Sequence, residues 1–190
     1  MKRVILVHRW YGSPEADWYP WLKQELESKE ITVLVPAMPT PDAPEIKTWN
    51  SALAKAVGKP DMDTYLIGHS VGCQTILRYL EQAAATARVG GCVFVAGFFD
   101  LQGIETEEEE RIAKSWLETP INCNKIKTHT KRIVTIFSDN DPFVKVDQAK
   151  LFEQRLQAKT IIESKKGHFS GSDGVKELPN AFKAVLEMAK

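Results

Sequence analysis

Short, continuous apolar runs alternate along the chain with segments in which apolar residues recur every three or four positions. The runs lie at Val4 to His8, Ile31 to Val35, Thr64 to Ile67, Cys92 to Ala96, Ile133 to Ser138 and Thr160 to Glu163. Because the runs do not alternate between apolar and polar residues, they predict strands that are buried on both faces. The segments between them have helical spacing, and we expect helices around residues 18–26, 46–53, 73–85, 152–156 and 178–186.

This alternation predicts the α/β class, with right-handed crossovers and helices on both faces of a parallel sheet. The segment from Pro36 to Pro44 carries four prolines and is expected to be a loop. The longest uncertain stretch, Phe98 to Thr130, is expected to contain a helix around Glu107 to Leu117. We favour an ordinary crossover helix there; the alternative is a segment that borders a substrate pocket.

The composition limits the possible partners and the domain count. A chain of 190 residues without a linker or repeat predicts a single domain, residues 1–190. Lys plus Arg and Asp plus Glu number 25 each, so neither nucleic acid nor an anionic membrane is an expected partner. The three cysteines are widely spaced and match no metal motif, which favours a reducing cytoplasm. We recognise no signal peptide and no apolar stretch of membrane-spanning length.

The strongest chemical signal follows the third apolar run. Gly68-His69-Ser70-Val71-Gly72 has the pattern G-x-S-x-G, in which a serine lies on a sharp turn between a strand and a helix. Glycines two residues to either side are needed because larger side chains would collide with the neighbouring elements. The pattern predicts that Ser70 is a nucleophile.

A serine nucleophile needs an imidazole to take its proton. Among the four histidines, His168 follows the last apolar run, and open α/β sheets build their sites at that end of the strands. It also completes the chain order Ser, Asp, His. The other three, His8, His69 and His129, are interpreted first as structural or surface histidines.

The imidazole in turn needs a carboxylate to fix its tautomer. The acid is expected after the fifth run, where Asp139 and Asp141 both lie. Asp139 is expected to stabilise the turn by accepting hydrogen bonds from nearby backbone amides. Spacing alone does not decide between the two carboxylates.

Acyl transfer also needs donors for an oxyanion. The backbone amide of Val71, directly after the nucleophile, is one candidate, and that of Trp10, in the loop after the first strand, is the other. Arg9 is a candidate to select an anionic substrate group. The further pocket candidates are Tyr11, His69, Phe98, Phe143 and Phe169. Aromatic residues at such positions belong more often to the core than to a pocket.

Several motifs together resemble one family. They are Val7-His8, Trp18-Tyr19-Pro20-Trp21-Leu22, Gly68-His69-Ser70-Val71-Gly72-Cys73, Val95-Ala96-Gly97-Phe98, Asp139-Asn140-Asp141-Pro142-Phe143-Val144 and Gly167-His168-Phe169. On these residues the chain resembles the α/β-hydrolases nearly end to end, specifically the small retinoblastoma-binding protein nine (YdeN-like) serine hydrolase family.

The resemblance implies a triad of Ser70, Asp141 and His168. It also implies a three-layer α/β/α sandwich around a six-stranded parallel sheet of order 2-1-3-4-5-6, without a large cap domain. Many relatives carry glycine where this chain has Arg9, and this departure bears on the second oxyanion donor and on the electrostatics of the pocket.

The leading hypothesis is therefore a serine hydrolase of small carboxylic esters, with amides or thioesters as further candidates. No metal or cofactor is expected, and the chain is expected to be a monomer or weak homodimer whose protein partners are unknown. The alternative is a non-catalytic binding or regulatory protein that retains the fold. The Leu-x-Cys-x-Glu partner motif of that family does not match Ile121 to Lys125. A nucleotide-binding protein is disfavoured because no G-x-G-x-x-G follows the first strand.

Overall fold

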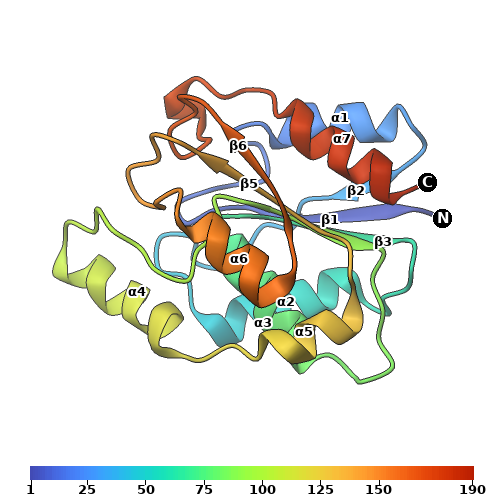
Figure 1. The fold of residues 1–190 in the computed structure, drawn as a ribbon, viewed down its shortest axis with the longest axis horizontal. Coiled ribbons are helices and arrows are strands. Elements are labelled where there is room, and N and C mark those ends of the chain that lie inside the picture. Colours follow the sequence, from blue (N-terminus) through green and yellow to red (C-terminus); the bar gives the residue numbers. More distant parts are fainter.

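Six strands form one parallel sheet in the computed structural model, which describes residues 1–190 (Figure 1). The strand order is β2-β1-β3-β4-β5-β6, and every neighbouring pair is parallel. The strands are β1 (Arg3–Val7), β2 (Thr32–Leu34), β3 (Thr64–His69), β4 (Gly91–Val95), β5 (Ile133–Ser138) and β6 (Lys159–Glu163). The predicted fold class and strand order are confirmed, and the expected strand limits are correct to within two residues.

The burial of the strands explains their continuous apolar sequences. Every residue of β3, β4 and β5 is buried, because helices cover both faces of the centre of the sheet. The edge strands β2 and β6 contain exposed residues. Side chains on both faces of a central strand are therefore buried away from water, so both faces need apolar residues.

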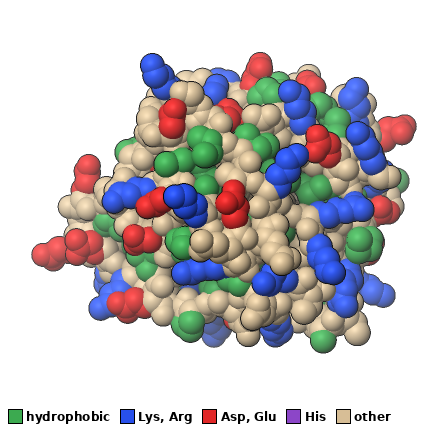
Figure 2. Space-filling model, viewed as in Figure 1, with side chains coloured by type: hydrophobic (Ala, Val, Ile, Leu, Met, Phe, Trp, Pro, Cys, Tyr) green, Lys and Arg blue, Asp and Glu red, His purple; other side chains and the backbone are tan.

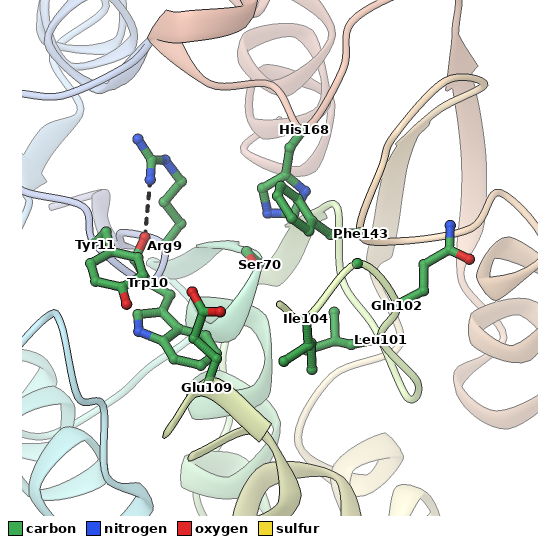
Figure 3. Close-up of a pocket in the computed structure, with 11 residues that line it drawn as sticks. Arg9, Trp10, Tyr11, Ser70, Leu101, Gln102, Ile104, Glu109, Phe143 and His168 are labelled. Carbon is green, nitrogen blue, oxygen red and sulfur yellow. Dashed lines mark hydrogen bonds between the residues drawn. The ribbon is translucent and has the colours of Figure 1, made fainter. Parts of the chain in front are cut away.

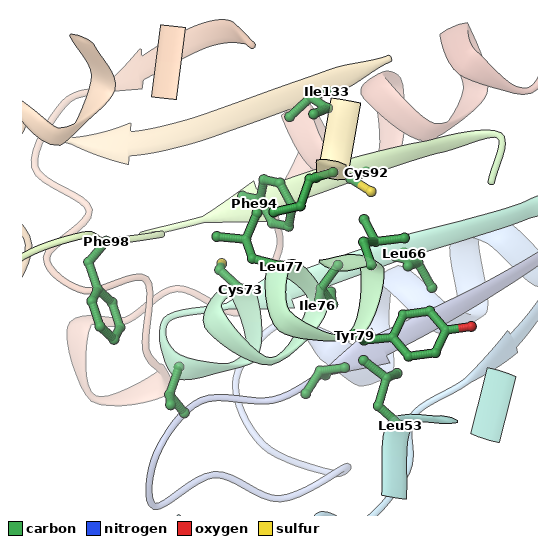
Figure 4. Packing of buried hydrophobic residues seen from close by; sticks show 14 of the residues in the cluster. Leu53, Leu66, Cys73, Ile76, Leu77, Tyr79, Cys92, Phe94, Phe98 and Ile133 are labelled. Atoms are coloured by element: carbon green, nitrogen blue, oxygen red, sulfur yellow. The ribbon is translucent and has the colours of Figure 1, made fainter. Parts of the chain in front are cut away.

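Helices cover the sheet on both sides. Helices α1 (Tyr19–Glu27) and α7 (Pro179–Met188) pack on one face, while α2 (Ile46–Val57), α3 (Val71–Gln82), α5 (Cys123–His129) and α6 (Gln148–Leu156) pack on the other. A core of 27 buried residues lies under the second group and one of 23 under the first. Figure 4 shows Ile76 and Leu77 of α3 facing Leu66 and Phe94 of the sheet. The α/β/α sandwich predicted above is thus formed.

The segment between β4 and β5 holds two helices rather than the one expected. The expected helix is α4 (Glu107–Glu118), whose start is fixed by a reciprocal capping box between Thr106 and Glu109. Helix α5 was not expected because its sequence is short and polar, and Ile126 is its one buried aliphatic side chain. Its first turn is stabilised by the Asn122 side chain, which accepts a hydrogen bond from the Lys125 amide at 3.1 Å.

The charged side chains on the surface agree with the equal numbers of acidic and basic residues in the sequence. Figure 2 shows acidic and basic side chains interspersed on the visible face. No helix combines the length and the apolar character that crossing a membrane would need.

The parallel register brings distant loops together at one edge of the sheet. Val7 pairs with Gly68, His69 pairs with Val95, and Ser138 pairs with Glu163. The loops that follow β1, β3, β4, β5 and β6 therefore leave the sheet at its carboxyl edge. This is the edge at which open α/β sheets bind their ligands.

Candidate functional site

Ser70 lies between the end of β3 and the start of α3 with an unusual backbone conformation. Its φ is 55° and its ψ is −119°, a region that residues other than glycine seldom adopt. The turn is held by two hydrogen bonds, from the Ser70 amide to the Val95 carbonyl and from the Cys73 amide to the Ser70 carbonyl, each 2.9 Å. The serine is thus fixed at the tip of a tight turn.

The two flanking glycines are required by close packing. A Cβ atom on Gly68 would lie 2.6 Å from the Cys73 amide nitrogen. A Cβ atom on Gly72 would collide with the backbone carbonyl of Val7 on the neighbouring strand. Both contacts are with backbone, which cannot move aside cheaply, so any side chain at either position would displace the turn.

His168 and Asp141 form a direct pair. His168 follows β6 and Asp141 follows β5, and each residue is 8% exposed. His168 Nδ1 lies 2.8 Å from Asp141 Oδ2. The other carboxylate oxygen, Oδ1, accepts hydrogen bonds from the amides of Phe143 at 2.8 Å and Val144 at 3.0 Å. Because a carboxylate oxygen accepts, Nδ1 carries the proton, and the unprotonated Nε2 of the neutral ring is free to accept another.

Asp139 does not bond His168, and it bonds the loop after β6 rather than the amides of its own turn, which corrects the role expected from sequence. Its side chain accepts hydrogen bonds from the Ser164 hydroxyl and the Lys165 amide, each 2.7 Å. The Lys165 amide, followed by the Ser164 hydroxyl, lowers the pKa of Asp139. This exposed carboxylate therefore ties the end of β5 to the loop after β6.

Ser70 and His168 share one pocket of about 170 Å³ (Figure 3). Both face it without a direct hydrogen bond between their side chains, a separation often seen before substrate binds. The pocket is lined by Arg9, Trp10, Tyr11, Ser70, Leu101, Gln102, Gly103, Ile104, Glu109, Phe143 and His168. The structure thus brings together the loops after β1, β3, β4, β5 and β6.

Two backbone amides near Ser70 have no acceptor. The Val71 amide begins α3 and precedes its hydrogen-bonded ladder, and the Trp10 amide also makes no hydrogen bond. The Trp10 residue is nevertheless held in place, since its carbonyl accepts from Arg9 Nη1 at 3.0 Å and its indole donates to the Asp42 carbonyl at 2.9 Å. Both amides are available to bind an anionic oxygen.

Arg9 lines the pocket, but its charge is already balanced. Its Nε donates to Asp17 Oδ2 at 2.8 Å and its Nη2 donates to Asp17 Oδ1 at 3.3 Å. Burial alone would raise the pKa of Asp17, but hydrogen bonds from Arg9 and from the Gly171 amide outweigh it and lower that pKa. The expectation that Arg9 attracts an anionic substrate group is weakened by this pair.

Three of the expected pocket residues lie elsewhere. His69, Phe98 and Phe169 are at most 1% exposed and do not line the pocket, which corrects their assignment from sequence. Phe98 belongs to the core under α3, and Phe169 to the core under α1 and α7. Both side chains are large and apolar, and each is buried in one of the two cores rather than in the cleft.

His8 and His129 are structural, as expected. His8 lies at the end of β1, where Nδ1 contacts the Arg9 carbonyl at 2.8 Å and Nε2 accepts from the Met38 amide at 3.1 Å. His129 contacts the Ala87 carbonyl at 2.9 Å, near the amino ends of the strands. No three His, Cys, Asp or Glu side chains converge in a way that could hold a metal ion.

The residues that sequence reasoning missed come from the segment after β4. Leu101 to Ile104 and Glu109 line one side of the pocket. This segment therefore borders the pocket, and the favoured interpretation of an ordinary crossover was wrong. The capping box at Thr106 marks the start of α4 in the sequence, but nothing in the sequence shows that this start faces Ser70.

Comparison with known proteins gives a consistent picture. The model of the family described as serine hydrolase matches residues 4–187. YdeN of Bacillus subtilis (strain 168) is 28% identical over 179 residues, covering 94% of this chain and 91% of that protein. The serine hydrolase RBBP9 of Rattus norvegicus is 28% identical over 173 residues, covering 90% and 88%.

Solved structures extend the likeness to the fold. The crystal structure of the ydeN gene product from B. subtilis has a TM-score of 0.89 and 26% identity, covering 99% of this chain and 98% of that one. Est1E from Butyrivibrio proteoclasticus has a TM-score of 0.72 at 16% identity, covering 98% and 88%. The second likeness is one of fold.

Proposed function

This chain belongs to the serine hydrolase family, and we propose that it hydrolyses small carboxylic esters through an acyl-enzyme intermediate on Ser70. The observation that carries the proposal is the pocket itself, in which a serine at positive φ faces a histidine bonded to a carboxylate at 2.8 Å. Amides and thioesters would follow the same chemistry. Ester hydrolysis is the reaction that this geometry supports best.

In the first step Ser70 attacks the carbonyl carbon of the ester. A bond forms between Ser70 Oγ and that carbon, and the hydroxyl proton passes to Nε2 of His168. The carbonyl oxygen becomes an anion. The free amides of Val71 and Trp10 are the donors that would stabilise it.

The intermediate then collapses and the alcohol leaves. The bond to the leaving oxygen breaks, and that oxygen takes the proton from His168. A water molecule repeats the sequence on the acyl-enzyme: its proton passes to His168, its oxygen bonds to the acyl carbon, and Ser70 is released as the proton returns to it. Asp141 keeps Nδ1 protonated throughout and stabilises the positive imidazole.

This mechanism predicts how the rate depends on pH. An imidazole must be neutral to accept a proton, so kcat/KM for an aryl acetate is expected to rise as pH increases from 5 to 8. The measurement is a set of initial rates in buffers of constant ionic strength, with the folded fraction checked at each pH. A rate that stays flat over this range in fully folded protein would contradict a histidine general base.

The lining of the pocket favours neutral acyl groups. Leu101, Ile104 and Phe143 supply apolar walls, and Arg9 is neutralised by Asp17. Glu109 is the remaining charged residue of the lining, and Figure 3 shows its carboxylate beside Trp10 and directed toward the centre of the pocket. We therefore propose small, uncharged acyl groups and expect anionic ones to be disfavoured by Glu109.

Glu109→Gln tests this preference. Glutamine keeps an acceptor for the capping box, whose Glu109 oxygen accepts from the Thr106 amide at 3.2 Å, so α4 should remain intact. The ratio of kcat/KM for an aryl hemisuccinate to that for the aryl acetate is expected to rise about fivefold, because a repulsion of ~1 kcal/mol in a partly solvated site is removed.

Glu110→Gln is the matched control for this prediction. Glu110 lies next to Glu109 on the same helix, is exposed and does not line the pocket. Glu110→Gln should therefore leave the ratio of kcat/KM for the two esters unchanged. If both variants change the ratio equally, the effect comes from the overall charge of α4, and the proposed role of Glu109 is wrong.

A further inference from the structure

His69, next to the nucleophile, is fully buried and uses both ring nitrogens. Its Nδ1 lies 2.7 Å from the Tyr19 hydroxyl, and its Nε2 lies 2.7 Å from the backbone carbonyl of His168. The imidazole therefore contacts the loop that carries the proposed general base through its backbone rather than through its side chain. This contact spans 99 residues of sequence.

The partners fix the tautomer of His69. A carbonyl can only accept, so Nε2 carries the proton and donates to His168. Nδ1 of the neutral ring then accepts from the Tyr19 hydroxyl. Burial, together with the neighbouring His168, lowers the pKa of His69 to about 3, and the ring stays neutral near pH 7.

Tyr19 extends this series of hydrogen bonds to the loop after β1. Its oxygen accepts a hydrogen bond from the Arg9 amide at 3.2 Å, the residue directly before the proposed oxyanion donor Trp10. One series of hydrogen bonds thus runs from the Arg9 amide through Tyr19 and His69 to the His168 carbonyl. It joins the loop after β1, the end of β3 and the loop after β6.

An ionic bridge runs alongside this series of neutral hydrogen bonds. Asp17 pairs with Arg9, accepts from the Gly171 amide at 2.7 Å, and lies 3.8 Å from His69 Nδ1. It connects the loop after β1 to the segment that follows His168. The charged or titratable groups around His69 are therefore Asp17, Arg9, Tyr19 and His168.

We propose that His69 is a positioning residue, whose two hydrogen bonds set the distance between the backbone of His168 and the loop that presents the Trp10 amide. The inference rests on the proposed function, because it assigns those two loops the general base and an oxyanion donor. His69 itself does not line the pocket and touches no substrate.

The two hydrogen bonds of His69 leave little room for the loops to move, because each is 2.7 Å long. Both hydrogen bonds are short and completely buried, so the loss of the imidazole would leave the His168 carbonyl without a donor and the Tyr19 hydroxyl proton without an acceptor, away from water. Loops in that situation shift until each polar group finds a partner. A displacement of about 1 Å at a catalytic group reduces turnover about 100-fold.

The test compares three variants of the chain with a matched control. His69→Phe removes both bonds, Tyr19→Phe removes the donor to Nδ1, and His69→Gln retains one donor and one acceptor. His129→Gln is the control, since His129 is equally buried, bonds a backbone carbonyl and lies near the other edge of the sheet. Each variant is assayed for kcat and KM with the aryl acetate at a temperature at which it is fully folded.

We expect His69→Phe to lower kcat by about 10- to 100-fold with KM changed less than about twofold, because the apolar wall residues Leu101, Ile104 and Phe143 lie on loops that His69 and Tyr19 do not hold. Tyr19→Phe should lower kcat by about 5- to 20-fold, and His69→Gln should restore kcat to within about fivefold of the wild type. His129→Gln should lower thermal stability without lowering kcat. Equal kcat values for His69→Phe and wild type would overturn the proposal, as would equal losses of kcat for His69→Phe and His129→Gln.

A second readout keeps the inference separate from the proposed function. The imidazole N–H proton that His168 shares with Asp141 is followed by NMR. It should be visible in wild type and in His129→Gln, and should exchange faster with water in His69→Phe. If wild type hydrolyses no ester but this pattern holds, the proposed function fails while the positioning role stands. If wild type is active and the proton is unaffected in His69→Phe, the positioning role fails alone.

Discussion

Replacing Ser70 with alanine is expected to lower kcat for the aryl acetate by about 10⁴-fold or more and to abolish labelling by a fluorophosphonate probe. The alanine lacks the oxygen that forms the acyl bond, and no other residue can take its place at the tip of the turn. It retains the Cβ atom at a φ of 55°, so the elbow should keep its shape. The probe bonds Ser70 Oγ to phosphorus as fluoride leaves, which intact mass spectrometry measures directly.

Ser115→Ala is the control for this experiment. The Ser115 hydroxyl donates to the Ile112 carbonyl within α4 at 2.8 Å and does not line the pocket. This variant should be labelled and should hydrolyse the ester like wild type. If kcat of Ser70→Ala is within tenfold of the wild-type kcat, another residue is the nucleophile. Wild-type protein that neither labels nor hydrolyses would favour the binding or regulatory alternative.

Replacing Asp141 with asparagine should have the second largest effect, a loss of about 10⁴-fold in kcat. The amides of Phe143 and Val144 both donate to Asp141 Oδ1, so the asparagine would turn its oxygen toward them and its NH₂ group toward His168. An NH₂ group donates, which forces Nδ1 of His168 to accept and moves the ring proton to Nε2. That nitrogen could then no longer take the proton of Ser70.

Asp139→Asn distinguishes this effect from a general loss of charge near the site. Asp139 lies two residues earlier, is exposed, and bonds Ser164 and Lys165 rather than His168. Asp139→Asn should retain kcat within about threefold, with a small loss of stability because the link between β5 and the loop after β6 is weakened. The assays are kcat for both variants and the ring ¹⁵N shifts of His168, which report its tautomer. If Asp139→Asn is the more damaging change, the acid has been assigned to the wrong carboxylate.

The sequence determined the parts of this protein that depend on local chemistry. The continuous apolar runs specified the parallel strands, because a strand covered on both faces has no solvent side on which polar residues can alternate. The G-x-S-x-G pattern specified the elbow at Ser70, since Gly68 and Gly72 are required wherever backbone approaches that closely. Within the sequence, only the family resemblance distinguishes Asp141 from Asp139, because two carboxylates two residues apart have nearly the same spacing to any distant residue.

Only the tertiary structure decided which side chains meet across loops. Three features join segments that are distant along the sequence or that fold back on themselves. They are the lining of the pocket by Leu101 to Ile104 and Glu109, the pairing of Arg9 with Asp17, and the hydrogen bonds of His69. Such contacts leave no periodic trace in the sequence, because each depends on the direction in which a loop leaves the sheet. Residue types fixed the available chemistry, and the shared carboxyl edge of the parallel strands fixed which groups act together.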